Sequence, residues 1–593
     1  MRRLAAAALC TLVLAPAALA DTVGGPVYDG KGRLVQTPFA PRPPGPHLTA
    51  KQATDAFSAY GKVHDWLVRY PRKSWVWGTT YDPKGAAWKV SVWSGKAGEI
   101  ATGRVDDASG QVTEAWTGPQ VAWRMARGYT GAFGGERINS YPVWLGFCAV
   151  FLLGLVDWRR LRSLRNLDLV VFLSFSVSLW YFNRGDVFTS VPLVYPALVY
   201  LLLRCLWVGA RGRAAPGRAV WPAWLLLGAT VFLMGFRIGL NAEASNVIDV
   251  GFAGVIGAER IAHGQAPYGH MPIEGTLKAC GPADAEGEIR NRIQTNGRCE
   301  SANPFGDTYG PVAYEAYLPG YAIAGWTGRW DDLPAAHVTS GLFDVVAAVG
   351  LLLVGRRFGG LSLGAVLAFA WAAYPFTQYA SSSNTNDLIP PALLIWGFWL
   401  STAAWARGAL CALSAWTKFA GLLLLPLWAT YPERRLRPAL RFAAGALLAT
   451  AAAFSILLFE PSPLHAARVF FDRTVRWQVG RDSPFSLWDW GQYHARGIPD
   501  LHLVQRVLEA LLVLGALAAG LWPRVKSPLQ LAALTGAILV GFELVLTHWS
   551  YLYLPWFFPF AAFAVLAPLT TEVPEALPAR DDGRPFGELV AAG

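Results

Sequence analysis

The chain has 593 residues, of which 53% are hydrophobic and only 15% are charged. Soluble domains carry about 25% charged residues, so this composition excludes an ordinary soluble protein and predicts one that crosses a membrane several times. The formal net charge is +11, but much of it lies in short turns between apolar runs, where it indicates membrane topology and gives no argument for nucleic acid as a partner.

Residues 1–20 have the pattern of a secretory signal peptide. Met1-Arg2-Arg3 is a charged start, an Ala/Leu run follows, and Ala18-Leu19-Ala20 is a small-residue cleavage site before Asp21. The apolar run is short for a membrane span of about 20 residues, although an uncleaved anchor helix is the alternative. Under either interpretation we expect the segment after Asp21 to be exported.

Residues 21–140 are polar and are predicted to form a small extracytoplasmic α+β domain. Thr49 is placed to cap an amphipathic helix that runs to about Tyr70. Short alternating runs divided by turn residues then predict four strands, at Ser74–Thr80, Ala87–Trp93, Glu99–Asp106 and Gln111–Trp116. This order of elements is similar to that of PepSY-like domains. It contains no catalytic constellation, so we expect an exported binding or regulatory module.

Apolar runs after residue 140 predict a mainly α, polytopic membrane helix bundle. We expect eleven spans, near 141–158, 168–183, 188–208, 221–240, 337–355, 361–380, 388–406, 436–459, 501–522, 528–547 and 551–569. The first three form an accessory segment, 141–220. The core is then 221–570, with external loops at 241–336 and 460–500, and a cytoplasmic tail follows at 571–593.

The distribution of Lys and Arg predicts the orientation of these spans. Turns assigned to the cytoplasm carry Arg159, Arg160, Arg162, Arg165, Arg211, Arg213, Arg218, Arg356, Arg357, Arg434, Arg435, Arg437, Arg524 and Lys526. Outside turns at 381–387 and 546–550 carry neither Lys nor Arg. The positive-inside rule therefore supports an extracytoplasmic N-terminal domain independently of the signal peptide.

One apolar run, Gly408–Thr430, does not fit this threading. Counting it as a span would place the arginines that follow it outside. The run has Trp416-Thr417-Lys418-Phe419 in its middle and Pro426 near its end. We therefore predict a broken or re-entrant pair of short helices, sheltered from lipid.

The cysteines predict one disulfide. Cys10 lies in the signal peptide, and Cys148, Cys205 and Cys411 lie inside apolar runs and are interpreted as core residues. Cys280 and Cys299 lie together in a polar external loop, where exported surroundings favour a bridge. No second Cys or His keeps ligand spacing with them, so we expect no metal site there.

From Trp221 onward four motifs resemble a known family in their order. They are Asp249-Val250-Gly251-Phe252 through Gly264-Gln265-Ala266-Pro267-Tyr268; Thr308-Tyr309-Gly310-Pro311 ahead of Tyr317-Leu318-Pro319; Leu413–Phe419 with Leu425-Pro426; and His548-Trp549-Ser550-Tyr551 with Pro555. Together they resemble glycosyltransferase family 87 of the GT-C superfamily over the region 221–570. The family more often has Tyr-Pro-Pro where this chain has Tyr317-Leu318-Pro319.

The resemblance implies an enzyme of a bacterial plasma membrane. It would transfer a sugar, mannose or another hexose or a pentose, from a polyprenyl-phosphate donor to an extracytoplasmic glycolipid, polysaccharide or protein. No cofactor is expected, because the chain has no P-loop, no dinucleotide-binding glycine motif after a strand and no metal-ligand spacing. A weakly held external divalent cation stays open.

Asp249 is the expected catalytic residue. Displacing phosphate from a sugar's anomeric carbon requires a base for the attacking hydroxyl and positive charge for the departing phosphate. Asp249 follows the span 221–240 on the external side, and the family analogy makes it the base of an inverting displacement. The alternative is an N-cap of the next helix. Asp307, in the same external loop, is the rival base and otherwise a substrate-binding residue.

Positive charge for the phosphate is expected from the external loop 460–500. This loop carries Arg468, Arg473, Arg476, Arg481 and Arg496, and Arg468, Asp472 and Arg476 repeat on one helical face that would lie along the membrane surface. The same loop holds five acids, Glu460, Asp472, Asp482, Asp489 and Asp500. A self-paired, solvated surface is therefore the equal alternative.

Further donor-binding or substrate-binding candidates come from the motifs and from polar groups at external helix ends. They are Tyr268, Tyr309, Asn386, Asp387, Lys418 and His548. Lys418 needs a partner or a cavity inside its apolar run, with snorkelling to an interface as the alternative. Asp387 alternatively caps the helix that follows it.

Two other functional classes stay open. A transporter or flippase of lipid-linked sugars would be favoured by internal repeats, which we do not detect. A non-catalytic membrane scaffold that presents the exported domain is the second alternative.

Overall fold

The structure is a computed structural model that describes residues 27–28, 31, 34–36, 46–212, 220–282, 289–330 and 332–567. The predicted signal peptide and cytoplasmic tail lie outside the described residues, as do Arg213 and Arg218. The chain forms two compact units: one comprises residues up to Arg124 together with Tyr493–Pro499, and the other comprises the rest. The smaller unit thus ends before the boundary predicted at residue 140 and takes in a short piece of the loop 460–500.

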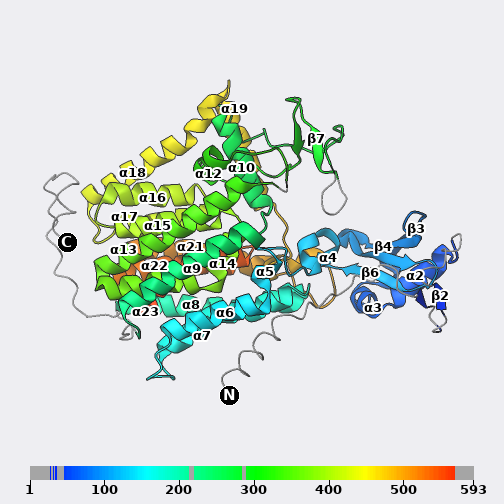
Figure 1. The fold of residues 1–593 in the computed structure, drawn as a ribbon, viewed down its shortest axis with the longest axis horizontal. Coiled ribbons are helices and arrows are strands. Elements are labelled where there is room, and N and C mark those ends of the chain that lie inside the picture. Colours follow the sequence, from blue (N-terminus) through cyan, green and yellow to red (C-terminus); the bar gives the residue numbers. More distant parts are fainter. Residues whose placement is uncertain are drawn as a thin grey trace, which may run out of the picture. The chain divides into compact units, whose positions relative to one another are not determined.

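The smaller unit contains a four-stranded antiparallel sheet in the order β3-β4-β5-β6, at the positions predicted from the alternating runs (Figure 1). The strands are β3 (Trp75–Asp82), β4 (Ala87–Ser94), β5 (Glu99–Asp106) and β6 (Val112–Thr117), and a separate pair, β1 (Val27–Tyr28) and β2 (Leu34–Gln36), precedes them. Six of the eight β4 residues are buried, and the two exposed ones are Lys89 and Trp93.

Helices α2 (Ala50–Ala59) and α3 (Gly61–Leu67) cover this sheet. Thr49 caps α2 through a reciprocal capping box with Gln52, as predicted. The single helix predicted to reach Tyr70 is instead two, because Tyr60 has an extended backbone (φ −63°, ψ 123°) that interrupts it. Phe57 packs so closely on β5 that a Cβ at Gly103 would lie 2.5 Å from its ring, which explains glycine there.

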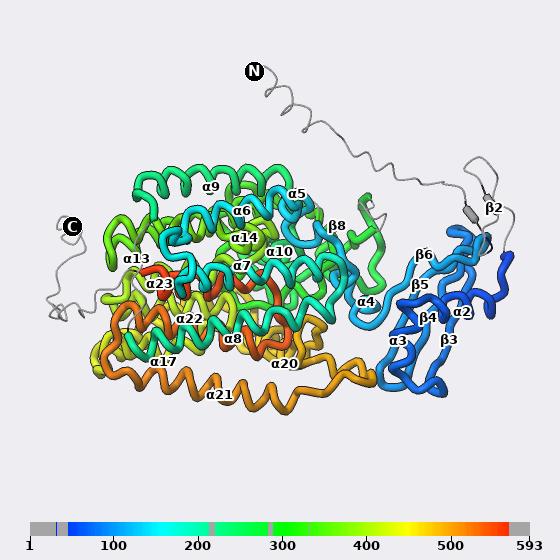
Figure 2. Tube along the Cα trace, turned by 90° about the horizontal axis from the view of Figure 1, so that it is seen from below, coloured from blue at the N-terminus to red at the C-terminus, as the bar shows by residue number. Residues whose placement is uncertain are grey.

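The larger unit is helical. Its helices are α5 (Glu136–Asn139), α6 (Tyr141–Leu155), α7 (Leu164–Phe182), α8 (Val187–Arg211), α9 (Ala223–Ala244), α10 (Asp249–Ala262), α11 (Val312–Glu315), α12 (Leu318–Ala324), α13 (Pro334–Ala373), α14 (Pro375–Ser382), α15 (Ile389–Trp399), α16 (Ala404–Ala415), α17 (Leu425–Ala429), α18 (Leu436–Phe454), α19 (Pro463–Phe471), α20 (Trp477–Val479), α21 (His502–Leu521), α22 (Pro528–Val545) and α23 (Leu554–Leu566). Figure 2 shows α9 and α21 on opposite sides of this bundle.

In the described part of the chain, six helices are long and apolar enough to cross a membrane, which indicates a membrane protein. They are α8, α9, α13, the segment Leu436–Phe459, α21 and α22. The predicted total of eleven spans goes beyond this and is not confirmed. Helix α13 is interrupted at Gly359–Gly360, where Gly360 has φ +77°, and this break falls between the spans predicted at 337–355 and 361–380.

The region from 388 to 430 differs from its prediction in part. The helix predicted for 388–406 ends at Trp399, and α16 begins at Ala404 after a turn. The predicted break of Gly408–Thr430 is present: α16 ends at Ala415, and a 3₁₀ turn, Phe419–Leu424, leads into α17. The start and the end of this broken segment lie side by side, because the buried Arg407 guanidinium donates to Tyr431 O at 2.9 Å.

The arginine-rich turns lie at one end of the helical unit. Contacts between the chain segments there are Trp221 Nε1 to Leu153 O (2.8 Å), Gln530 Nε2 to Gly209 O (3.0 Å), Lys526 N to Pro432 O (2.8 Å) and Arg357 Nη1 to Trp399 O. Helices α10, α12 and α19 gather at the end where α18 finishes (Figure 1). A buried ion pair, Arg237 to Asp344 at 2.9 Å, joins α9 to α13 between these ends.

The predicted disulfide between Cys280 and Cys299 is present and closes the loop that carries β7 (Asn291–Ile293) and β8 (Cys299–Ser301). Beside it, buried Arg260 of α10 pairs with Glu300 at 2.6 Å. The bridge closes the loop, and the ion pair attaches it to α10.

Replacing both bridging cysteines with serine should destabilise this loop by about 3 kcal/mol, because the unfolded loop gains conformational freedom. The measurement is the thermal unfolding midpoint in detergent, with Cys148→Ser as the matched control at a free thiol. Equal midpoints for the double variant and the control would show that the Arg260–Glu300 pair alone holds the loop.

Candidate functional site

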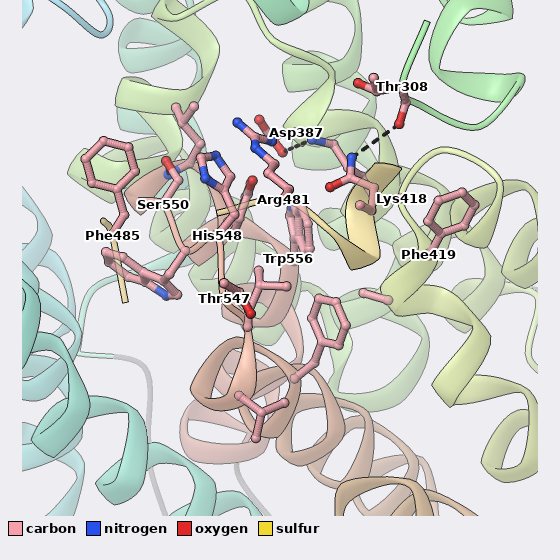
Figure 3. Close-up of a pocket in the computed structure, with 18 of the residues that line it drawn as sticks. Thr308, Asp387, Lys418, Phe419, Arg481, Phe485, Thr547, His548, Ser550 and Trp556 are labelled. Atoms are coloured by element: carbon pink, nitrogen blue, oxygen red, sulfur yellow. Dashed lines mark hydrogen bonds and ion pairs between the residues drawn. The ribbon is translucent and has the colours of Figure 1, made fainter. Parts of the chain in front are cut away.

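A cavity of about 650 Å³ lies in the helical unit, and several of the predicted polar residues line it (Figure 3). Its polar wall includes Asp249, Thr308, Tyr309, Asp387, Lys418, Gln478, Arg481, Asp489 and His548. Its apolar wall includes Leu422, Leu423, Leu512, Val513 and Phe542, which come from the 3₁₀ turn before α17, from α21 and from α22. The cavity therefore combines a charged part with a part suited to an apolar chain.

Asp249 is the first residue of α10, and its side chain is exposed to the cavity. The N-cap is Ile248 and Asp249 is the residue after it, so the interpretation of Asp249 as an N-cap is wrong. A negative charge in the first turn of a helix is nonetheless favoured by the helix dipole. Asp249 is therefore held by its backbone, and its carboxylate stays available to a ligand.

The start of α10 is fixed by direct packing on the turn after α14. A Cβ at Gly251 would lie 2.0 Å from Asn384 O, so only glycine permits this approach. Asn384 has φ +53°, and its side-chain amide donates to Asn246 O at 2.8 Å. This contact positions Asp249 beside the segment that carries Asp387.

The cavity changes the acidity of Asp249. Burial among protein walls leaves the carboxylate poorly hydrated and raises its pKa above the ordinary value, while the charge of Arg481 opposes this rise. A carboxylate with a raised pKa is a stronger base than an ordinary aspartate.

Lys418 and Asp387 form an ion pair at the cavity wall (Figure 3). Lys418 Nζ lies 3.2 Å from Asp387 Oδ1, an ionic contact without the alignment of a hydrogen bond. The ammonium group also lies over the rings of Tyr309, Tyr553 and Trp556, at 4.8, 5.3 and 5.7 Å from their centroids. Lys418 thus has partners inside the protein, and its interpretation as a snorkelling residue is wrong.

The break between α16 and the following 3₁₀ turn brings Lys418 to the cavity. Lys418 itself has an extended backbone (φ −139°, ψ 126°). The chain on the other side is close, because a Cβ at Gly310 would lie 1.9 Å from Trp416 O. Asp387 is fixed separately: Thr385, and not Asp387, caps the short 3₁₀ helix Asn386–Leu388, and its hydroxyl donates to Asp387 Oδ2 at 2.7 Å.

Arg481 and His548 come from two further segments. The Arg481 guanidinium lies over the Trp477 ring, 4.9 Å from its centroid. His548 Nδ1 is hydrogen-bonded to Ser483 Oγ at 2.9 Å. Burial and the charges of Arg481 and Lys418 hold the pKa of His548 well below its ordinary value, so the imidazole is neutral at physiological pH.

Several residues predicted for the site do not line the cavity. The Asp307 carboxylate is bound by Arg473, with Nε at 2.8 Å from both oxygens, and by Gly269 N at 2.9 Å. Tyr268 is buried and its hydroxyl donates to Tyr309 O at 3.0 Å. Asn386 is buried, and its amide has no hydrogen-bond partner among the residues described. Asp307 is therefore a poor rival for the role of base.

Of the five arginines expected to surround a phosphate, only Arg481 lines the cavity. Arg473 forms an ion pair with Asp307, and Arg468 and Arg476 are exposed on a helix surface. Arg496 belongs to the smaller unit. The alternative of a self-paired surface holds only for Arg476, which lies 3.7 Å from Asp472.

Sequence reasoning missed several residues of the cavity. Tyr553 and Trp556 follow the His548 motif but are not among the residues predicted for the site. Asp489, considered only as a neighbouring acid, accepts from Ser483 N and from Gln492 at 2.8 Å, and burial raises its pKa. Gln478 donates to Thr308 O at 3.3 Å. No local pattern singles these out, because their role depends on where the loop folds.

The arrangement can accept a proton and hold a negative group within one cavity. Asp249 can take up a proton, and Lys418 with Arg481 supplies fixed positive charge in a poorly hydrated site, where electrostatic stabilisation is strong. Within the described residues no group of three or more His, Cys, Asp or Glu side chains is placed to hold a metal ion. Comparison of the chain with family models, with curated proteins and with solved structures found no match.

Proposed function

We propose that this protein is an integral-membrane glycosyltransferase of the GT-C type, similar to family 87, that uses a polyprenyl-phosphate sugar as donor. The observation that carries the proposal is the composition of one cavity: an aspartate exposed to it, with a raised pKa, stands in the same wall as Lys418 and Arg481. The acceptor is an extracytoplasmic glycolipid, polysaccharide or protein, and no cofactor takes part.

In the proposed topology the cavity opens on the extracytoplasmic side of a bacterial plasma membrane. Its support is that the arginine-rich turns lie at the opposite helix ends from the cavity, as the positive-inside rule requires. The chain crosses the membrane eleven times, and 408–430 forms a re-entrant pair whose tip carries Lys418. The α+β unit is then extracytoplasmic and the C-terminus cytoplasmic.

The proposed reaction is a single inverting displacement. Asp249 removes the proton from the acceptor hydroxyl, whose oxygen bonds to the anomeric carbon as the bond from that carbon to the phosphate oxygen breaks. The bonding electrons leave with the lipid phosphate, and Arg481 and Lys418 stabilise its charge. Tyr309 and Trp556 offer faces for the sugar ring, and the apolar wall accommodates the start of the polyprenyl chain.

The direct test is transfer from labelled polyprenyl-phosphate hexoses and pentoses by the full-length protein, with Arg481→Gln as the diagnostic variant. Losing a charge-assisted hydrogen bond of about 1.5–3 kcal/mol should raise the KM for the donor by about 10- to 100-fold. Because Arg481 also lowers the pKa of Asp249, the acidic limb of the pH–rate profile should move to higher pH in this variant.

Arg476→Gln is the matched control, since Arg476 lies in the same loop but is exposed and does not line the cavity. It should change neither the KM nor the acidic limb. If the wild-type protein transfers none of the donors while retaining its fold, the transferase proposal fails, and a carrier of lipid-linked sugars or a scaffold takes its place.

A further inference from the structure

A helical segment at 463–479, made of α19, a π-helical turn at Asp472–Arg476 and α20, follows directly after the membrane-spanning candidate Leu436–Phe459. One face of this segment is used inside the protein. Phe470 is buried between Tyr268 and Phe454, with ring centroids 5.0 Å from each. Trp477 stacks on Phe305 at 5.8 Å. The inner face therefore attaches the segment firmly to the helical unit.

The opposite face is apolar and uncovered within the protein. Leu464, Phe471 and Val479 are 87%, 54% and 73% exposed. They recur at spacings of seven and eight residues, which places them on one side of a helix. Large side chains with this exposure cost free energy in water, so the face needs an apolar or interfacial environment.

Positive charges border this apolar stripe. Arg468 is exposed between Leu464 and Phe471, and Arg476 is exposed between Phe471 and Val479. Arg476 lies 3.7 Å from Asp472, which is a long, solvent-exposed contact of little strength. Neither arginine lines the cavity, so the phosphate-binding role expected for them in the site does not explain their presence.

We propose that the outer face of the 463–479 helix lies in the headgroup layer of the membrane and binds anionic phospholipids. Leu464, Phe471 and Val479 enter the boundary of the acyl chains, and Arg468 and Arg476 contact lipid phosphates, the combination that characterises interfacial amphipathic helices. Continuity supports the depth: the preceding span ends with exposed Leu458 and Phe459, only a few residues before Pro463.

An interfacial helix at 463–479 is independent of the proposed reaction, but it would fix the depth of one wall of the cavity in the membrane. Arg481 lies two residues after Val479, the last residue of α20, and its guanidinium stacks on the Trp477 ring of that helix. An interfacial position of this helix therefore holds the cationic wall of the cavity at the depth of lipid phosphates. A lipid-linked substrate would reach it without leaving the membrane.

The test measures the depth of single side chains in the full-length protein reconstituted into lipid nanodiscs. In a Cys148→Ser background, Leu464, Phe471 or Val479 is replaced by cysteine and spin-labelled, and collisions with oxygen and with a water-soluble nickel chelate are compared. Leu447→Cys on the exposed face of α18 is the membrane control, and Lys51→Cys on α2 is the water control. We expect the three labels to favour oxygen several-fold over the water control.

A second arm tests the charge preference with the same labels. Adding phosphatidylglycerol to phosphatidylcholine nanodiscs should immobilise the label at Phe471→Cys further, and the variant Arg468→Gln/Arg476→Gln should lose this dependence. Labels that collide mainly with the nickel chelate would overturn the interfacial placement. Labels shielded from both reagents would also overturn it, because a protein partner would then cover the face. Depth without any lipid dependence would overturn the anionic preference.

Discussion

Replacing Asp249 by Asn is expected to reduce the rate of sugar transfer by about 10²- to 10⁴-fold, the usual contribution of a general base. Asparagine keeps the shape of the side chain but cannot take the acceptor's proton. The protein should fold normally, because the side chain is exposed to the cavity and the N-cap of α10 is Ile248. The measurement is kcat at saturating donor and acceptor, together with the thermal unfolding midpoint.

Glu243→Gln is the matched control for Asp249→Asn, because Glu243 is an exposed carboxylate near the end of α9 that does not line the cavity. It should leave kcat unchanged. The wild-type rate should rise with pH as Asp249 loses its proton, with its midpoint above the ordinary aspartate pKa because burial raises this pKa. Full activity of Asp249→Asn would assign the proton transfer to another group, with Asp387 the next acid in the cavity wall.

Asp307→Asn gives a useful contrast, since the sequence made it the rival base. The structure places this carboxylate in a buried ion pair with Arg473 instead. Its replacement should therefore lower the unfolding midpoint and reduce kcat only in proportion to the folded protein lost. A selective loss of kcat at unchanged stability would return Asp307 to the reaction.

The sequence predicted the small unit well because the information there is local. Alternation of apolar residues, turn residues and the Thr49 cap each act over a few residues, and the four strands begin and end within one or two residues of their predicted bounds. The exception, the break at Tyr60, depends on how α2 and α3 each pack on the sheet. The periodicity of apolar residues in the sequence carries no information about this packing.

The helical unit shows where hydropathy stops being informative. A run of apolar residues predicts a helix but not its end, so the sequence predicts one span at 388–406 although the chain turns after Trp399. Arg407 is buried just beyond this turn, where Trp428 O and Tyr431 O accept from its guanidinium at 2.9 Å. In the sequence, an arginine at this position marks the end of an apolar run. The carbonyl groups that bind its guanidinium come from residues more than 20 positions away and are evident only in the structure.

For the site, residue type and motif brought Asp249, Tyr309, Asp387, Lys418, Arg481 and His548 to attention, and all six line one cavity. The failures share one cause. Asp307 and Arg473 are 166 residues apart, and charge alone cannot tell that they satisfy each other and not a substrate. Arg468 and Arg476 could not be told from Arg481 without knowing which part of the segment 463–481 faces the cavity.

Replacing Lys418 by Met is expected to have the largest effect on stability. Asp387 is only 1% exposed, and its other oxygen is already engaged by Thr385. Without the ammonium group, an uncompensated carboxylate stays buried, which typically costs about 3–5 kcal/mol. Asp387→Asn in the same chain should recover most of this loss, because the neutral amide needs no counter-charge.

Buried Cys411 of α16, seven residues before Lys418, provides the measurement, since a thiol-reactive dye can reach it only when this region unfolds. The unfolding midpoint followed by Cys411 labelling should fall strongly in Lys418→Met. It should return towards the wild-type midpoint in Lys418→Met/Asp387→Asn. The double variant should nevertheless stay impaired in transfer, because the cation that faces the departing phosphate is gone. A single variant as stable as the wild type would mean that Thr385 and the surrounding rings suffice to hold Asp387. A double variant with normal transfer would remove Lys418 from the reaction and leave Arg481 as the phosphate's partner.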